Sequence, residues 1–205
     1  AYKTMRENLV AEFEEGSVTA ANQAVKAGKL VQISSGFLYD EGEVISFDCS
    51  PRLEALEEVI EELTAKIIIF ASHRAAVELV TKHLTTCGHK CLNIHGGVSD
   101  NKRVEAFRKF KNDPDYRIIV ADPRTMSHGL TLVEANTVLW WSLPTSNEVF
   151  QQANARVRRP GQTRVTRVVT LLSSPIEDKL LSVLKARQST QGMFLELIKK
   201  GDADV

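Results

Sequence analysis

Short apolar runs alternate with longer amphipathic stretches from Lys66 onward. The clearest runs, KIIIFAS and YRIIVAD, are rich in isoleucine and valine, which is typical of strands covered on both faces of a sheet. The predicted strands are KIIIFAS, CLNIH, YRIIVAD, TVLWWSL and RVTRVVTLL. The stretches between them place apolar residues at helical spacing. Because strands that alternate with helices form mostly parallel sheets with helices on both faces, the pattern predicts an α/β fold.

Several predicted helices begin and end at recognisable residues. Pro51 follows Ser50 and occupies the first helical position of a helix whose apolar residues continue to Leu63. Gly88 ends the helix HRAAVELVTKHLTTCG, and Ser99 caps the next helix, which stops before Asp113-Pro114. These signals predict where the helices of the α/β region lie.

The two ends of the chain have a different pattern. Residues 1–34 predict two helices broken near Gly16-Ser17. Residues 34–48 predict a turn-rich connector with strand character from Val44 to Phe47. A last helix is expected from Pro175 through Lys200, with a break at Gly192. The chain opens without a methionine in a helix-like sequence, so we expect it to be a fragment of a longer protein.

The stretch EVFQQANARVRRPGQ, residues 148–162, predicts a helix that ends before Pro160. At 3.6 residues per turn, three polar side chains share one face: Gln152, Arg156 and Arg159. The opposite face carries an apolar stripe: Phe150, Ala153 and Val157. Guanidinium groups bind phosphate oxygens two at a time, so this face suits a phosphate. A solvated arginine face is the alternative interpretation.

Composition limits the classes of protein that fit. The 205 residues are 43% hydrophobic and 25% charged, as in an ordinary globular protein, and the formal net charge is zero. Nucleic-acid binding would therefore need a local basic patch, and the densest one is Arg156, Arg158, Arg159, Arg164 and Arg167. Three cysteines fit a reducing compartment, and no apolar run approaches the ~18 residues of a membrane span. We expect a cytoplasmic protein that is neither secreted nor membrane-bound.

Ligands of parallel sheets bind where the strands end at their carboxyl termini. The predicted strands end in polar, small or basic residues: Ser72-His73-Arg74, Gly96-Gly97-Val98-Ser99 and Pro123 to Gly129. Gly96-Gly97 precedes a predicted helix, whose free N–H groups could hold a nucleic-acid phosphate. Ordinary turn chemistry explains each of these ends equally well when it is taken alone.

The order of these segments resembles that of the Swi/Snf-like ATPases, a branch of the superfamily-two helicases. IIIFASHRAAVELV resembles motif IV, and HGGVSDNKRVEAFRKF resembles the element that follows it. DPRTMSHGLTL resembles motif V, and QANARVRRPGQ resembles motif VI. The resemblance extends from Lys66 to Leu172, and short bacteriophage-encoded members are the most similar. The chain differs where the family has Gly-Gly, Asn and Trp, with Met126-Ser127, Thr131 and Thr145 at those positions.

The resemblance implies a domain organisation and a set of partners. Residues 1–48 are expected to be a helical connector, and residues 49–205 the second, C-terminal RecA-like lobe with its last helix. No G-x-x-x-x-G-K-[ST] phosphate loop is present, so ATP and Mg²⁺ are expected on a missing N-terminal lobe. The implied partners are that lobe and double-stranded DNA bound through its phosphates. We expect a monomer that has no ATPase activity without the other lobe.

The resemblance also implies roles for individual residues. The catalytic residues are expected to be Arg156 and Arg159 as arginine fingers, with Gln152 positioning the nucleotide or water. The expected nucleotide-site residues are Gly129, Thr131, Gln152, Arg156 and Arg159. The expected DNA-binding residues are Ser72, Arg74, Gly97, Arg124, Thr125 and Ser127. A non-catalytic RecA-like module that binds DNA or protein is the alternative, whereas a Rossmann-type enzyme lacks its G-x-G-x-x-G.

Three other features are interpreted as structural. Asp40-Glu41 imitates a magnesium-binding pair but has no phosphate loop before it, so we expect a surface turn. Trp140-Trp141 could stack on a base, but strand alternation buries one of them in the core, and we expect both there. A histidine- and cysteine-rich segment, Cys87, His89, Cys91 and His95, lacks the usual zinc spacing, so we expect no metal on this chain.

Overall fold

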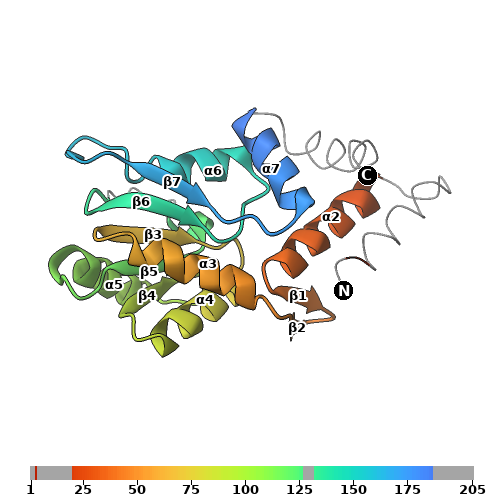
Figure 1. Cartoon of the computed structure of the whole chain (residues 1–205), viewed down its shortest axis with the longest axis horizontal. Coiled ribbons are helices and arrows are strands. Elements are labelled where there is room, and N and C mark those ends of the chain that lie inside the picture. The colour runs from red at the N-terminus through yellow and green to blue at the C-terminus, as the bar shows by residue number, and fades with distance from the viewer. Residues whose placement is uncertain (1–2, 4–19, 127–131, 187–205) are drawn as a thin grey trace. The chain divides into compact units, whose positions relative to one another are not determined.

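The computed structural model describes Lys3 and residues 20–126 and 132–186; of residues 20–24 it describes the backbone alone (Figure 1). These residues form two compact units. One unit comprises the chain up to Cys49, Thr145–Asn147 and the chain from Leu172. The other comprises Ser50–Pro144 and Glu148–Leu171. Each unit is described by itself.

A five-stranded parallel sheet forms the centre of the larger unit, in the order β4-β5-β3-β6-β7. The strands are β3 (Lys66–Phe70), β4 (Cys91–Ile94), β5 (Ile118–Ala121), β6 (Ala135–Trp140) and β7 (Arg167–Thr170). The helices are α3 (Ser50–Glu61), α4 (Arg74–Thr86), α5 (Asp100–Asn112), the 3₁₀ turn η1 (Pro123–Met126) and α6 (Asn147–Asn154). Figure 1 shows the strands side by side, and α4 and α5 pack against β4. The predicted α/β fold with a parallel sheet is confirmed.

The central strands are buried because helices cover the sheet. The whole of Ile67–Phe70 is inaccessible to solvent, as expected for a strand covered on both faces. Trp140 and Trp141 are also fully buried, which confirms the prediction that both belong to the core. The Trp140 ring lies 5.0 Å from the ring of Phe70 and 5.1 Å from that of Phe150, and its Nε1 donates to Asn154 Oδ1 at 3.0 Å.

One buried charge was not predicted. Arg52, in the first turn of α3, is only 6% exposed. Its guanidinium donates to the carbonyl oxygens of Trp141 and Leu171, and it lies 4.9 Å from the centre of the Trp141 ring. Since Trp141 follows β6 and Leu171 follows β7, this arginine joins the ends of two neighbouring strands to α3.

The smaller unit contains α2 (Ala20–Ser34), a hairpin of β1 (Phe37–Asp40) and β2 (Glu43–Ser46), and α7 (Pro175–Lys185). The expected connector is therefore more regular than predicted, because Phe37–Asp40 also forms a strand. Glu41 and Gly42 have φ angles of 45° and 91°, typical of a two-residue hairpin turn, and both are exposed. Asp40-Glu41 is thus a surface turn, as predicted.

The last described helix packs within the smaller unit. Leu180 and Leu184 of α7 are fully buried, and α7 contacts α2. Ser34 donates to Ser174 at 2.8 Å, and Ser173 donates to the carbonyl oxygen of Ser34 at 3.1 Å. The expected first helix, apart from Lys3, and the continuation of the last helix lie outside the described residues. Among the helices described, none is both long and apolar enough to cross a membrane.

Candidate functional site

The segment that carries Arg156 and Arg159 is a turn, and the predicted helix through Arg159 is wrong. Helix α6 ends at Asn154. The N–H groups of Arg156 and Arg158 then donate to carbonyls three residues back, at 3.1 and 3.3 Å, so the chain tightens into successive turns. The Asn154 side chain meanwhile accepts from Trp140 in the core. We call residues 155–162 the arginine turn.

The three polar residues of the predicted face lie in different environments. Gln152 is exposed and donates to Glu148 Oε1 at 2.8 Å, one helical turn earlier. Arg156 is only 4% exposed, and Arg159 is half-buried. Burial and, to a lesser degree, the neighbouring Arg159 lower the pKa of Arg156, but a guanidinium stays charged in proteins. The apolar stripe was predicted correctly: Phe150, Ala153 and Val157 are all buried.

The arginine turn is fixed to the segment that leads into β6. The N–H of Leu132 donates to the carbonyl oxygen of Arg156 at 3.4 Å. Gln162 Nε2 lies within hydrogen-bonding distance of the carbonyl oxygens of Ala135, Val133 and Val157, at 2.7, 3.2 and 3.2 Å. Gln162 was recognised as part of a motif, but its role in holding the turn was not predicted. Gly129 and Thr131, the other expected nucleotide-site residues, lie outside the described residues.

A second group of predicted residues gathers at the carboxyl ends of β3, β4 and β5. We call this group the carboxyl-edge cluster: Ser72, His73, Arg74, Gly97, Arg124 and Thr125. Thr125 Oγ1 donates to the carbonyl oxygen of Asp122 at 2.7 Å and lies 3.5 Å from that of Ile94. Arg124 Nη1 lies 3.5 Å from the carbonyl oxygen of Ser72. Hydrogen bonds therefore link the ends of three strands. Ser127, the sixth expected DNA-binding residue, lies outside the described residues.

Arg74 and Gly97 lie against each other within this cluster. A Cβ atom built on Gly97 would lie 3.3 Å from Arg74 Nη1 and 3.1 Å from the His95 ring, so a larger residue would displace one of them. The Gly97 N–H donates to His95 Nδ1 at 3.1 Å. The Gly97 N–H is therefore occupied in this conformation, and phosphate binding by the N–H groups at the start of α5 stays a prediction. Arg74 itself is exposed and pairs with Glu78 at 2.8 Å.

Ser72 is a structural member of the cluster. Its side chain is 2% exposed, and its hydroxyl donates to the carbonyl oxygen of Ser142 at 3.1 Å. Its N–H donates to the Ser142 hydroxyl at 2.9 Å. These bonds join the ends of β3 and β6, so in this structure the hydroxyl faces protein and not solvent.

Burial is the main cause of the pKa shifts of two neighbours of the arginines. Burial, with a smaller contribution from Arg124, lowers the pKa of His73 to about 4, so its ring is neutral at pH 7. Burial is also the main cause that raises the pKa of Asp122, against the hydrogen bond from the Arg124 N–H. The positive charge of the cluster at neutral pH therefore comes from Arg74 and Arg124, both exposed.

The structure separates the two predicted sets of residues. The carboxyl-edge cluster lies where β3, β4 and β5 end. The arginine turn is hydrogen-bonded to residues that precede or begin β6, so it lies at the amino end of that strand. The two sets therefore lie at opposite ends of the parallel strands. Spacing alone did not predict this separation.

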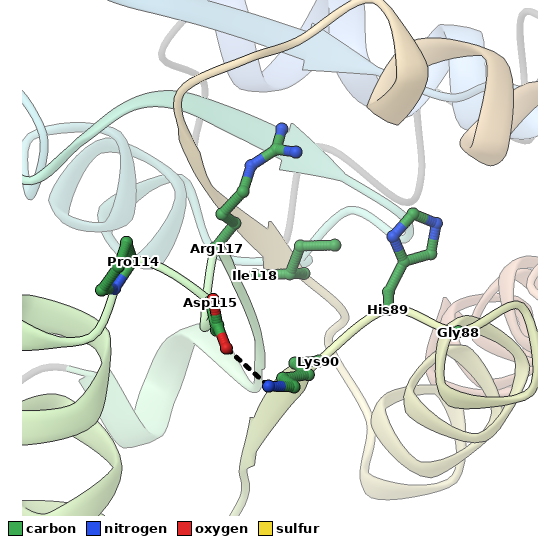
Figure 2. Close-up of a pocket in the computed structure, with 7 residues that line it drawn as sticks. All are labelled: Gly88, His89, Lys90, Pro114, Asp115, Arg117 and Ile118. Carbon is green, nitrogen blue, oxygen red and sulfur yellow. Dashed lines mark hydrogen bonds and ion pairs between the residues drawn. The ribbon is translucent and has the colours of Figure 1, made fainter.

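A pocket of about 360 Å³ lies elsewhere, at the amino ends of β4 and β5 (Figure 2). Its lining residues are Gly88, His89, Lys90, Pro114, Asp115, Arg117 and Ile118. Lys90 and Asp115 form an ion pair of 2.6 Å across it. None of the predicted site residues lines this pocket.

The sequence of the larger unit matches a known domain. Residues 51–161, more than half of the chain, match the family model "Helicase conserved C-terminal domain". The chain belongs to this family. The match covers the carboxyl-edge cluster and the arginine turn up to Gly161, so both sets of predicted residues fall within the helicase domain.

Curated relatives of this helicase domain are much longer proteins. The chain is 28% identical to the ATP-dependent helicase rhp16 of Schizosaccharomyces pombe over 148 residues, and the match covers 67% of this chain. Over 68% of its length it is 28% identical to the TATA-binding protein-associated factor BTAF1 of Arabidopsis thaliana. The chain covers 17% and 8% of these two relatives.

Solved structures give the same assignment. The chain is similar to the Sulfolobus solfataricus SWI2/SNF2 ATPase core in complex with double-stranded DNA, with a TM-score of 0.67 and 25% identity, covering 98% of this chain and 43% of that one. The C-terminal part of the Fun30 ATPase domain has a similar fold, with a TM-score of 0.64 and 23% identity, covering 73% and 53%. The helicase domain is thus a Swi2/Snf2-like C-terminal lobe with a RecA-like fold.

Proposed function

We propose that this chain is the C-terminal lobe of an ATP-dependent DNA translocase. The observation that carries the proposal is the arginine turn of a helicase C-terminal domain, which contains one buried and one half-buried arginine and is hydrogen-bonded to the segment leading into β6. The chain carries no phosphate loop, so ATP and Mg²⁺ bind on an N-terminal lobe of the same protein. The two lobes close on the nucleotide and open after hydrolysis.

The two arginines have different tasks in this proposal. Arg159 is half-buried at the end of the turn and reaches the γ-phosphate as an arginine finger, offsetting the charge that develops during transfer. Arg156 lies deeper and adds fixed positive charge beneath it. Gln152, Gly129 and Thr131 complete the nucleotide site, with Gln152 positioning the nucleotide or the attacking water. Gln152 is exposed and its side-chain partner is Glu148, so it can exchange this contact when the lobes close.

The carboxyl-edge cluster binds DNA phosphates. Arg74 and Arg124, both exposed, supply the charge. Thr125, Gly97 and Ser127 are the further residues that we assign to this DNA track. Ser72 contributes through its bonds to Ser142, which hold the track in place. Contacts to phosphate carry no base information, so binding is independent of sequence. The similar Sulfolobus core in complex with double-stranded DNA supports a duplex as the partner.

The cluster can be tested by salt dependence in the protein that contains both lobes. Arg74→Ala and Arg124→Ala are each expected to weaken binding to all duplex sequences alike and to reduce the salt slope by about 1. Arg108→Ala is the control, because Arg108 is an exposed arginine of α5 outside the cluster. If Arg108→Ala changes the salt slope as much as the two cluster variants do, the assignment of DNA binding to the carboxyl-edge cluster is wrong.

The function itself is tested by ATP hydrolysis. The protein with both lobes is expected to hydrolyse ATP faster when double-stranded DNA is added, whereas this 205-residue chain alone shows no turnover. Turnover by the chain alone would refute the assignment of the nucleotide to another lobe. A two-lobed protein without any hydrolysis would instead support a non-catalytic module that binds DNA or a protein partner. We further propose a cytoplasmic monomer similar to the short bacteriophage-encoded members.

A further inference from the structure

Three side chains with metal-binding atoms meet on the larger unit, away from both proposed sites. They are Glu57 of α3, His83 of α4 and Cys87 at the end of α4, and their ligand atoms all lie within 4.8 Å of one another. His83 and Cys87 are four residues apart, so both project from the same side of the last helical turn. Glu57 approaches from the other helix. The sequence predicted no metal site, because Cys87, His89, Cys91 and His95 lack the usual zinc spacing and Glu57 lies in a distant segment.

The distances fit a single small cation. His83 Nε2 lies 3.2 Å from Glu57 Oε1 and 3.7 Å from Cys87 Sγ. A tetrahedral zinc ion holds nitrogen and oxygen at about 2.0–2.2 Å and sulfur at about 2.3 Å, which places ligand atoms roughly 3.3–3.8 Å apart. Two of the three separations are close to these values, and the third pair of atoms lies within 4.8 Å, so modest side-chain shifts would bring all three into coordination. Carboxylate, imidazole and thiolate together favour zinc over magnesium or calcium.

The two oxygens of the Glu57 carboxylate have different neighbours. Glu57 Oε2 lies 2.8 Å from His89 Nε2, whereas the buried Oε1 lies 3.2 Å from His83 Nε2. A histidine bonded to the second oxygen of a ligating carboxylate orients that ligand. Cys87 is exposed, so an ion can enter from solvent, and a water molecule would supply the fourth ligand.

We propose that Glu57, His83 and Cys87 bind a zinc ion and that His89 is the positioning residue for the carboxylate. The ion would join α3 to the end of α4 and to the turn that precedes β4. The proposal does not depend on the translocase function, because it concerns the side of the domain where β4 begins. A hydrogen-bonded trio without affinity for metal is the alternative.

Cobalt substitution tests the ligand set on the full chain. After removal of metal with a chelator, one equivalent of Co²⁺ should give visible bands of a four-coordinate ion and a sulfur-to-cobalt charge-transfer band. Cys87→Ser should abolish the charge-transfer band, and the control Cys91→Ser should keep it, because Cys91 Sγ lies near Thr85 and the carbonyl oxygen of Thr81 instead. Absence of the band from the unaltered chain, or its survival in Cys87→Ser, overturns the proposal.

Alkylation provides a test that needs no variant. The chain has three cysteines, of which Cys87 is exposed and Cys49 and Cys91 are half-buried. Zn²⁺ should slow the modification of Cys87 at least about tenfold, measured by peptide mass spectrometry, and leave the other two unchanged. Equal effects on all three, or none, contradict the site.

Thermal stability supplies an independent readout. Zn²⁺ at a hundredfold excess over its Kd should raise the Tm by about 5–10 °C, and His83→Gln should remove this increase. His73→Gln is the control, since His73 lies in the carboxyl-edge cluster. An increase that persists in His83→Gln shows an adventitious ion only.

Discussion

Arg159→Ala is expected to slow DNA-stimulated ATP hydrolysis at least about 100-fold in the protein with both lobes, or about 3 kcal/mol of transition-state stabilisation. An arginine finger acts on charge that develops during phosphoryl transfer, so its removal lowers kcat more than it weakens nucleotide binding. DNA affinity should stay within a few-fold, because Arg159 is in the arginine turn and not in the carboxyl-edge cluster. Steady-state kinetics and a binding titration on the same preparation measure both effects.

Arg158→Ala is the matched control for this experiment. Arg158 belongs to the same turn but is exposed, and its Nε lies 3.3 Å from Thr166 Oγ1. We expect nearly unchanged hydrolysis in this variant. Arg156→Ala is less informative, because Arg156 is only 4% exposed and its loss also disturbs packing. Equal losses of hydrolysis and DNA affinity in Arg159→Ala would contradict the separate roles of the two sites.

Arg52→Met is expected to lower the free energy of unfolding of the chain by about 2–4 kcal/mol, and its Tm by about 5–10 °C. Methionine fills a similar volume but cannot donate to the carbonyl oxygens of Trp141 and Leu171, which would remain in place without their donor. The cation–π contact with the Trp141 ring is also lost. Urea unfolding followed by circular dichroism measures the change.

The comparison for Arg52 is another arginine of the same unit. Arg108→Met on α5 removes an exposed guanidinium, so its effect should stay within about 0.5 kcal/mol. If the two variants unfold at the same urea concentration, the guanidinium of Arg52 does not stabilise the ends of β6 and β7.

Local patterns determined the fold and much of the core. The continuous apolar runs predicted the strands, because a strand covered by helices on both faces is apolar along its whole length and does not alternate with polar residues. Strand alternation buries one of Trp140 and Trp141, both were expected in the core, and both are fully buried. The order of the helicase motifs likewise depends only on sequence, and the family match over residues 51–161 agrees with it.

Only the tertiary structure decided where the polar side chains of these motifs lie. Helical spacing placed Gln152, Arg156 and Arg159 on one face, yet α6 ends at Asn154 and burial separates the three. Ser72 was expected to face DNA, but its hydroxyl bonds to Ser142 across the sheet. Such partners come from other strands, and the spacing within one segment contains no information about them.

The same distinction holds for the charged and metal-binding groups. In the sequence, Arg52 is one polar residue of an ordinary helical pattern. It is buried because the carbonyl oxygens of Trp141 and Leu171, after β6 and β7, accept hydrogen bonds from its guanidinium. Glu57 meets His83 and Cys87 only because α3 and α4 are neighbours in the fold. The sequence by itself determined most of the helices and strands, the parallel sheet and the family, since hydrophobic period and motif order are local properties. The tertiary structure decided which polar groups meet, because burial and pairing depend on segments that the chain brings together only when it folds.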